Sequence, residues 1–415
     1  MPLISDIKAR IVFNSRGNKT IEVEVTTDKK FVARACAPSG ASVGKHESQS
    51  FRDDDPTKSL EVLNKNTRKF IGVDAKDTRS VFEVLKSIDN TDKYTNIGGS
   101  VAYAVSIAAV DSAAMAIDTP LYQLLAPKGT YRFPFPLGNI LGGGAHAGPG
   151  TPDIQEILAC PIGAKTIMEA LEMNIKLHKE MRKAIEYVDR NFTYGRGDEG
   201  GWAPHLNNDQ AMGLAEKAVE NCGFSIGKDM SLGVDFASSS LWEDEKKGYN
   251  YSRQGLFRNT DKQIEFVNNM IKRYNLIYVE DPVNEEDFTG MAEITRTNPE
   301  CLVTGDDMLV TNALRVKEAV KYGACSAAIL KVNQAGSLFD AMKFAHECRQ
   351  NNLKIITSHR SGESTDSHIA HIAIATNSKM LKSGIVGGER ISKLNELLRI
   401  SEHGLIEGMT ELSIS

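Results

Sequence analysis

The first third of the chain changes from a strand-like to a helix-like hydrophobic pattern. Residues 20–27 alternate apolar and polar side chains, and a second apolar run at residues 31–37 follows a short polar break. Alternation with a period of two is typical of half-buried strands, so a hairpin is predicted. Residues 100–117 are instead rich in alanine at helical spacing and end shortly before a proline. We therefore expect an α+β domain over residues 1–125.

Residues 126–415 carry a different pattern, in which short apolar runs alternate with amphipathic stretches. Six of these runs end in a charged or polar residue: 231–235, 276–281, 302–307, 327–331, 354–359 and 380–382. The terminal positions 280, 306, 331, 359 and 382 are separated by 26, 25, 28 and 23 residues. That spacing is close to the roughly 30 residues of a strand-helix-strand unit and predicts a β/α barrel of parallel strands. A doubly wound open sheet would give similar spacing, but no glycine-rich dinucleotide loop supports it.

Composition narrows the class of protein. A net charge of -5 over 415 residues gives no basic surface for nucleic acid. No run approaches the roughly 18 apolar residues of a membrane span, so a cytoplasmic location is expected. The six cysteines form no C-x-x-C pair and are predicted to be reduced and buried, in preference to disulfides or a zinc site. Residues 38–44 are small and suit no regular element, which predicts a loop that can move.

Three predicted strands end in carboxylates, at Asp235, Glu280 and Asp306. The carboxyl ends of barrel strands converge at one mouth, where three like charges would repel unless a cation lay between them. Oxygen ligands of this kind suit magnesium. Each acid could instead cap the helix that follows its strand, but three such acids together favour a metal site.

Two later strands end in lysines, Lys331 and Lys382. An ammonium at such a position either reaches solvent or enters the mouth, where nearby cations would lower its pKa and suit it to act as a general base. Arg360, at another strand end, matches a phosphate or carboxylate in geometry and charge, although it could equally pair with a structural acid. Glu199, Glu156 and His146 lie in or beside glycine-rich loops, where such residues are more often turn formers or packed side chains.

Taken in order, these segments resemble the enolase family from residue 15 to residue 400. The motifs that carry the resemblance lie at residues 15–18, 38–42, 146–147, 155–156, 197–201, 280–282, 305–307, 330–334 and 358–363. The resemblance implies a magnesium-dependent lyase that interconverts 2-phosphoglycerate and phosphoenolpyruvate in glycolysis and gluconeogenesis. It also implies a smaller amino-terminal domain with a lid loop, a catalytic barrel and a homo-oligomer, dimeric or larger.

The resemblance also assigns roles to individual residues. Asp235, Glu280 and Asp306 would bind a first Mg2+, and a second Mg2+ would arrive with substrate and be held by Ser42. Lys331 would remove the proton from carbon 2, and Glu199, assisted by Glu156, would protonate the departing hydroxyl. The expected substrate contacts are His146, Glu156, His359, Arg360, Ser361, Lys382 and, from the lid, His46.

Departures from the family pattern fall in loops. Asn14 replaces a usual aspartate, Ser240 stands where a glutamate is common, and residues 383–390 are one residue shorter than usual and lack an arginine. These changes leave local loops and the subunit contact open. Two rival functions remain: an acid-sugar dehydratase or racemase of the same superfamily, and a non-catalytic scaffold. The first usually needs a Lys-x-Lys pair, which residues 154–158 lack, and the second would have lost a proposed ligand, acid or base.

Overall fold

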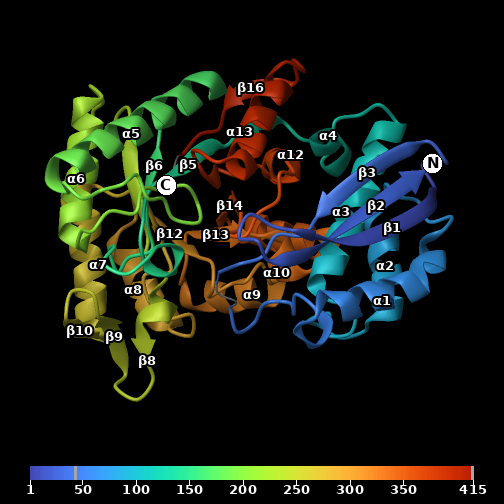
Figure 1. Ribbon diagram of the computed structural model, residues 1–415, viewed down its shortest axis with the longest axis horizontal. Coiled ribbons are helices and arrows are strands. Elements are labelled where there is room, and N and C mark those ends of the chain that lie inside the picture. The colour runs from blue at the N-terminus through green and yellow to red at the C-terminus, as the bar shows by residue number, and fades with distance from the viewer. Residues whose placement is uncertain (42–43, 413–415) are drawn as a thin grey trace.

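The amino-terminal part of the computed structural model is a three-stranded antiparallel sheet covered by helices; the structure describes residues 1–41 and 44–412 (Figure 1). The sheet has the order β1 (Ile4–Phe13), β2 (Lys19–Thr27), β3 (Phe31–Cys36). The predicted hairpin is therefore confirmed. The first strand was not predicted, because few of its side chains are buried and it lacks a clear period of two.

Four helices complete this part: α1 (Pro56–Asn66), α2 (Thr78–Ile88), α3 (Gly99–Ala116) and α4 (Leu121–Leu125). The helix α3 packs on β2 and β3 and is apolar on every side, as expected for a helix enclosed by other elements. It is long and apolar enough to cross a membrane, so the expectation that no run approaches the length of a membrane span is wrong. Because 83% of it is buried inside the fold, α3 is a core helix.

The larger part of the chain is a closed eight-stranded barrel, as the spacing predicts. Around the barrel the strands follow the order β11-β12-β13-β14-β15-β5-β6-β7. Their bounds are β5 (Phe135–Gly142), β6 (Glu156–Cys160), β7 (Ser231–Asp235), β11 (Tyr278–Glu280), β12 (Leu302–Gly305), β13 (Ala327–Leu330), β14 (Lys354–Ser358) and β15 (Met380–Gly384).

One barrel strand contradicts the expectation that all run parallel. The strand β6 is antiparallel to both β5 and β7. A parallel return needs a crossover connection, usually a helix, but residues 143–155 form a short link whose regular part is a single 3-10 turn. As a consequence, the first residue of β6, Glu156, pairs with the last residue of β7, Asp235. Both therefore lie at the same rim.

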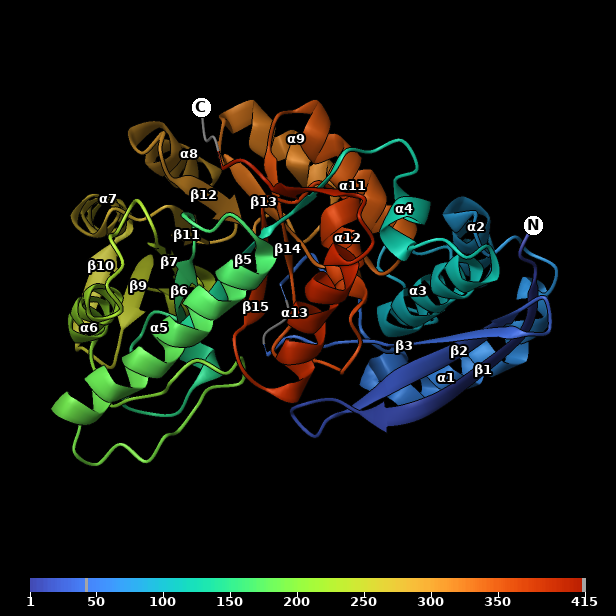
Figure 2. The same ribbon diagram turned by 90° about the horizontal axis from the view of Figure 1, so that it is seen from above.

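Helices surround the barrel (Figure 2). The main ones are α5 (Ile167–Val188), α6 (Asn208–Asn221), α7 (Thr260–Tyr274), α8 (Phe288–Thr297), α9 (Ala313–Tyr322), α11 (Leu338–Gln350), α12 (His368–Ala375) and α13 (Gly388–Ser401). Smaller elements are β4 (Tyr131–Phe133), β8 (Trp242–Glu243), β9 (Gly248–Tyr251), β10 (Leu256–Asn259), β16 (Ile406–Met409) and α10 (Val332–Ala335). The 3-10 turns are η1 (Arg52–Asp54), η2 (Thr67–Phe70), η3 (Gly144–His146) and η4 (Ser238–Leu241).

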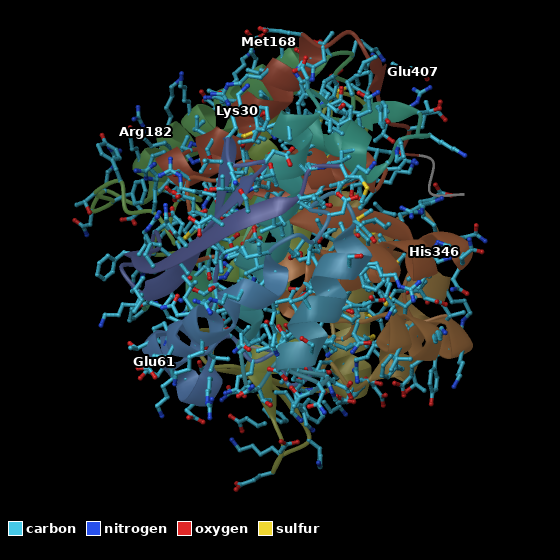
Figure 3. The ribbon with its side chains drawn as sticks, turned by 90° about the vertical axis from the view of Figure 1, so that its right-hand side faces the viewer. Lys30, Glu61, Met168, Arg182, His346 and Glu407 are labelled. Carbon is cyan, nitrogen blue, oxygen red and sulfur yellow. The ribbon has the colours of Figure 1, made fainter. Side chains whose placement is uncertain are left out.

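Polar side chains separate into an outer set and a buried set. Lys30, Glu61, His346 and Glu407 lie exposed on the surface (Figure 3). The six cysteines are free thiols, five of them buried and Cys325 half-buried, as predicted. The buried charged residues concentrate at the barrel mouth, where the amino-terminal part joins the barrel through a bridge between Ser39 and Gly362.

Candidate active site at the barrel mouth

A polar cavity opens at the mouth of the barrel. It is lined by Gly40, Ala41, His146, Gln155, Glu199, Asp235, Ala237, Asp281, Asp306, Asp307, Lys331, Ser358, Arg360, Ser361 and Lys382. Five of these residues are acids and three are lysine or arginine, so acids are in excess. Segments as distant in sequence as residues 40 and 382 therefore meet in one pocket.

Two of the three strand-end acids share a buried ammonium. The Lys382 Nζ lies 2.8 Å from Asp235 Oδ2, 2.5 Å from Glu280 Oε2 and 3.0 Å from Glu156 Oε2. Burial, followed by the charge of Asp235, raises the pKa of Glu280 to about 8. The charge of Asp306 adds to this rise, so the third acid also lies close enough to affect the pKa of Glu280. The single positive charge of Lys382 therefore does not balance the negative charges of the carboxylates around it.

The third acid, Asp306, lies beside Lys331 just beyond β12 and β13. The Lys331 ammonium donates to Asp306 Oδ2, and Gln334 Nε2 donates to Asp306 Oδ1 at 3.0 Å. Burial lowers the pKa of Lys331, but the charge of Asp306 and other acids raises it more. The expectation of a lowered pKa is therefore wrong for this arrangement, because a carboxylate is the direct partner of the lysine.

Asp281 fixes the turn that carries Asp306. Its two carboxylate oxygens accept the backbone N–H groups of Asp306 and Asp307 at 2.9 and 2.8 Å. Asp281 itself has a φ of 41°, an uncommon conformation for a residue other than glycine. Asp281, Asp306 and Asp307 place ligand atoms close enough together to hold a metal ion. The carboxylates of this turn are thus held by the backbone as well as by side chains.

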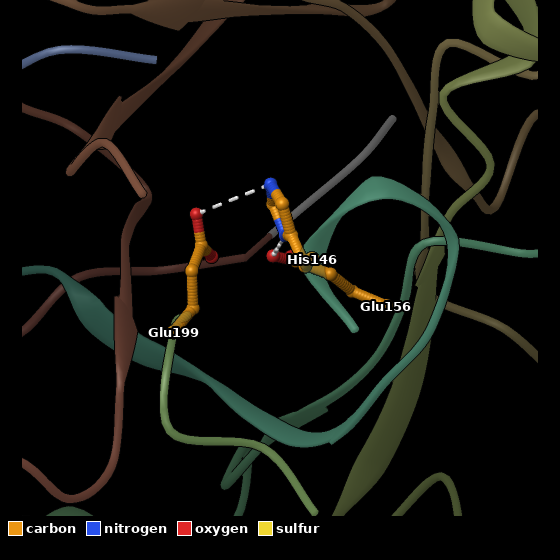
Figure 4. Close-up of side chains that lie close together, drawn as sticks. All are labelled: His146, Glu156 and Glu199. Atoms are coloured by element: carbon orange, nitrogen blue, oxygen red, sulfur yellow. Dashed lines mark hydrogen bonds and ion pairs between the residues drawn. The ribbon is translucent and has the colours of Figure 1, made fainter. Parts of the chain in front are cut away.

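The other side of the mouth is a chain of histidines and glutamates (Figure 4). His146 Nδ1 lies 3.0 Å from Glu156 Oε1, and His146 Nε2 lies 3.8 Å from Glu199 Oε1. The second oxygen of Glu199 bonds to His359 Nε2 at 2.8 Å. Glu199 is thus held between two imidazoles.

The charges of this chain differ from residue to residue. Burial, reinforced by the charge of Glu199, raises the pKa of Glu156 to about 7. Burial also raises the pKa of Glu199, but His359 and His146 lower it further, so it lies well below the ordinary value. The pKa of His146 is raised to about 9, because Glu199 and Glu156 outweigh burial, whereas burial lowers that of His359 to about 4. A proton at neutral pH therefore resides on Glu156 more readily than on Glu199.

Arg360 and Ser361, two of the residues predicted to contact phosphate or nearby substrate oxygens, line the cavity. The Arg360 guanidinium donates to Glu47 Oε2 and Oε1 at 3.1 and 3.2 Å. Ser361 Oγ lines the cavity, is buried and has no hydrogen-bond partner among the residues that the structure describes. His46 lies away from this lining and bonds to Glu286 at 2.7 Å. The predicted ligand Ser42 is outside the described residues.

Comparison with known proteins decides the family. Residues 4–125 match the model of the enolase N-terminal domain, and residues 130–409 match that of the enolase C-terminal TIM barrel domain. The chain is 42% identical to the enolase of Methanosphaera stadtmanae and 41% identical to that of Methanothermobacter thermautotrophicus, over 99% of each chain. It is 40% identical to the enolase of Archaeoglobus fulgidus, over 96% of this chain and 97% of that one. The chain belongs to the enolase family.

Enolases are phosphopyruvate hydratases, and this hydro-lyase activity on a phosphorylated small molecule is the activity of the chain. The fold class and the family expected from the sequence are confirmed. The structure brings most of the expected enolase residues to one mouth. Glu156, Glu280 and His359 lie behind the cavity lining, which they reach through Lys382 and Glu199.

Two buried residues at this enolase site were not predicted. Glu47, beside the lid, pairs with Arg360, and Arg390, on α13, bonds to His359. Neither lies at a strand end, and a charged residue within an amphipathic helix or a polar loop is expected to be exposed to solvent. The only signal in the sequence was the departure of residues 383–390 from the family pattern; this segment ends at Arg390, in the first turn of α13, but indicated no role for it.

Proposed function

We propose that Lys331 removes the carbon-2 proton of 2-phosphoglycerate and that Glu199, together with Glu156, delivers a proton to the departing carbon-3 hydroxyl. The observation that carries this proposal is that Lys331, Glu199 and Arg360 line one cavity with the strand-end acids. Proton removal next to a carboxylate creates a second negative charge on that group, and hydroxide is a poor leaving group. A base, an acid and positive charge are therefore all required in one place.

The donor set fits a divalent cation. Asp235, Glu280 and Asp306 are buried carboxylates, and the charges of Asp235 and Asp306 add to the effect of burial in raising the pKa of Glu280. We assign these three residues to a first Mg2+, with a second arriving with substrate at Ser42. Bound magnesium supplies Lewis-acid stabilisation of the charge that develops on the substrate carboxylate. With Asp306 bound to that ion, Lys331, its partner in this structure, would face carbon 2.

The remaining residues orient the substrate. Lys382 lies among three acids and offers its ammonium to the substrate carboxylate. Arg360 and the hydroxyl of Ser361, which has no hydrogen-bond partner in the described part of the chain, suit the phosphate, because a guanidinium and a hydroxyl donor match its oxygens. His146 and His359 flank the carboxylate of Glu199, which we assign as the acid. His46 would have to leave Glu286 to close over the phosphate.

The pair Glu156 and Glu199 supplies the acid. A proton held by Glu156, whose pKa is about 7, is available at neutral pH, and both carboxylates contact His146. Two buried carboxylates that share one proton provide a general acid where a single exposed one would be ionised. Transfer from Glu199 to the hydroxyl releases water and leaves the double bond of phosphoenolpyruvate.

We also assign the chain a two-domain organisation, with residues 1–125 as the lid-bearing domain and residues 126–415 as the catalytic barrel. The family matches to residues 4–125 and 130–409 support this division. By family membership we infer a cytoplasmic enzyme that forms a homodimer or larger ring and acts on a phosphorylated small molecule, without nucleic-acid or membrane partners.

The deciding assay follows phosphoenolpyruvate by its ultraviolet absorbance after 2-phosphoglycerate is added to the purified protein. We expect turnover with magnesium, none with an excess of chelator, and recovery when magnesium is restored. Turnover that is unchanged by the chelator would refute the metal assignment. An absence of turnover in magnesium from a folded protein would refute the proposed reaction.

A further inference from the structure

Arg390 is a buried cation in the first turn of α13. Its side chain is fully enclosed, with 0% exposed, and is among the largest buried side chains of the protein. Burying a charge is costly unless it is fully hydrogen-bonded, so the partners of this guanidinium indicate why it is kept. Nη2 donates to the carbonyl oxygens of Asp198 and Ser361 at 2.8 and 2.7 Å.

The other terminal nitrogen of Arg390 reaches a catalytic histidine. Nη1 lies 2.8 Å from His359 Nδ1 and donates to the carbonyl oxygen of Arg360 at 2.6 Å. The side chain therefore ties the loop that carries Glu199 to the loop that follows β14. Glu199 and His359, which lie in these two loops, are 160 positions apart in the sequence, and no strand pairing among the described residues joins the loops directly.

The contact between Arg390 and His359 fixes the position of a proton. An arginine side chain has donors and no acceptor, so His359 Nδ1 must accept and cannot carry a hydrogen. In the neutral ring the hydrogen then sits on Nε2, which lies 2.8 Å from Glu199 Oε2. His359 is thereby a donor to Glu199 and leaves the other carboxylate oxygen, Oε1, on the side of His146.

The positive charge of Arg390 acts in the same direction as its hydrogen bond, because both favour a neutral His359. The charged groups that face His359 are Glu199, Arg390 and Glu363. The two acids favour an imidazolium, whereas burial and the positive Arg390 disfavour it. An imidazolium beside Glu199 would stabilise the ionised carboxylate and so weaken the acid that must protonate the leaving hydroxyl.

We propose that Arg390 is a positioning residue that holds His359 neutral, with its hydrogen on Nε2, and so keeps the Glu199 side of the mouth able to deliver a proton. This inference rests on the proposed role of Glu199 as the acid. Arg390 is not itself among the residues that line the cavity. It acts through His359 and through the three loop carbonyls that it holds, those of Asp198, Arg360 and Ser361.

The first experiment compares Arg390→Met and Arg390→Lys with wild type in the pH profile of kcat. Loss of a positive charge at hydrogen-bond distance raises a neighbouring pKa by about 1 to 3 units, so the acid limb of the Arg390→Met profile should move to higher pH by at least about one unit. Arg390→Lys retains the charge and should show a smaller shift. We expect kcat of Arg390→Met at neutral pH to fall by about 10- to 100-fold, with KM changed less.

A matched control separates positioning from stability. The Arg258 guanidinium, on β10 of the separate β8-β9-β10 sheet, stacks on Tyr251 and Phe266 at 4.2 and 4.0 Å from their ring centres. Arg258→Met should lower the melting temperature without moving the pH profile. An Arg390→Met variant that behaves in the same way, with lower stability and an unchanged acid limb, would overturn the proposal.

The second experiment does not need a variant of Arg390 to fold. Nitrogen-15 spectra of histidine-labelled wild type, with His359 assigned through His359→Asn, report the tautomer directly. We expect a neutral ring with its hydrogen on Nε2 at pH 7 in wild type. In Arg390→Met, if that variant folds, the imidazolium should form at a pH at least about one unit higher than in wild type. A wild-type ring that carries its hydrogen on Nδ1, or both hydrogens, would overturn the proposal even if the enzyme is active. A confirmed tautomer with full activity of Glu199→Gln would instead refute the proposed acid.

Discussion

The two sides of the barrel mouth are built in different ways. On the side that we propose binds the metal, called the metal side below, Asp235 and Glu280 are the last residues of β7 and β11, and Lys331 directly follows β13. On the acid side, Glu199 lies in the loop between α5 and α6, and His146 lies in the connection between β5 and β6. One rim is therefore placed by the barrel register, and the other by loops that side chains must hold.

This difference explains what keeps each side in place. Paired strands fix Asp235 opposite Glu280, so the strand register places these two acids, whereas the turn that carries Asp306 is held by the side chain of Asp281. The acid side depends on hydrogen bonds to Glu199 from His359 and on the guanidinium of Arg390 behind it. Substitutions at loop anchors should therefore disturb proton delivery, while substitutions on the strands should disturb the metal site or proton removal.

The largest effect is expected from Lys331→Ala. Removal of the base should lower kcat by about 10⁴-fold, because no other lysine among the described lining residues lies beside Asp306. Magnesium binding, measured by titration calorimetry, should be retained. Turnover close to that of wild type would eliminate Lys331 as the base.

Glu199→Gln should come next, with a loss of about 10²- to 10³-fold in kcat. The amide keeps the size of the side chain but cannot carry the proton to the hydroxyl. Formation of phosphoenolpyruvate is the readout, and magnesium affinity should match that of wild type. A changed affinity for magnesium would mean that the two sides of the mouth are not separable.

Asp306→Ala should weaken magnesium binding, as measured by calorimetry, because a proposed ligand is lost. Asp281→Asn should also weaken binding, by about 10- to 100-fold, since Asp281 orients the turn that carries Asp306. Activity of both variants should recover in part at high magnesium concentration. If neither variant regains activity at high magnesium concentration and both bind magnesium as wild type does, the metal does not bind at this turn.

The smallest effect concerns a histidine and glutamate pair outside the mouth. His371 Nε2 lies 3.1 Å from Glu396 Oε1, and this hydrogen bond lowers the pKa of Glu396 to about 2. A lowered carboxyl pKa stabilises the fold above the ordinary value of 4.5, and that stability is lost as the pH falls toward about 2. Glu396→Gln should therefore cost about 1 to 3 kcal/mol at pH 7, and less as the pH falls below 4.5.

Urea unfolding between pH 3 and pH 7 measures this cost, with activity at neutral pH unchanged. Glu83→Gln is the control, because Glu83 pairs with Arg79 on the exposed face of α2 and should contribute less than about 1 kcal/mol. An equal loss of stability in both variants, or a loss independent of pH, would contradict the assignment of this pair.

The sequence could predict the strand-end side of the site but not all of the loop side. Regular spacing located the barrel, and the rule that chemistry gathers at carboxyl strand ends located Asp235, Glu280, Asp306 and Lys331. Glu156 escapes that rule because β6 is antiparallel, so its first residue lies at the mouth. Only family motifs pointed to Glu156 and Glu199.

Other features depend on three-dimensional contacts that no local pattern reports. Arg390 is placed by a helix whose start follows an unusual loop, and its partners are backbone carbonyls and a histidine from distant segments. The raised pKa of Lys331 likewise follows from the contact with Asp306. The strand β1 was missed because its burial comes from pairing with β2 and from a few residues such as Ile4 and Ile7.

One measurement tests most directly whether proton removal and proton delivery belong to separate sides of the barrel mouth. It is the exchange of the carbon-2 hydrogen of 2-phosphoglycerate with deuterium oxide, followed by proton NMR. Wild type and Glu199→Gln should exchange this hydrogen in magnesium, because Lys331 is intact, whereas Lys331→Ala should not. Exchange by Lys331→Ala, or exchange by wild type in excess chelator, would contradict the assignment of proton removal to Lys331 beside a metal site.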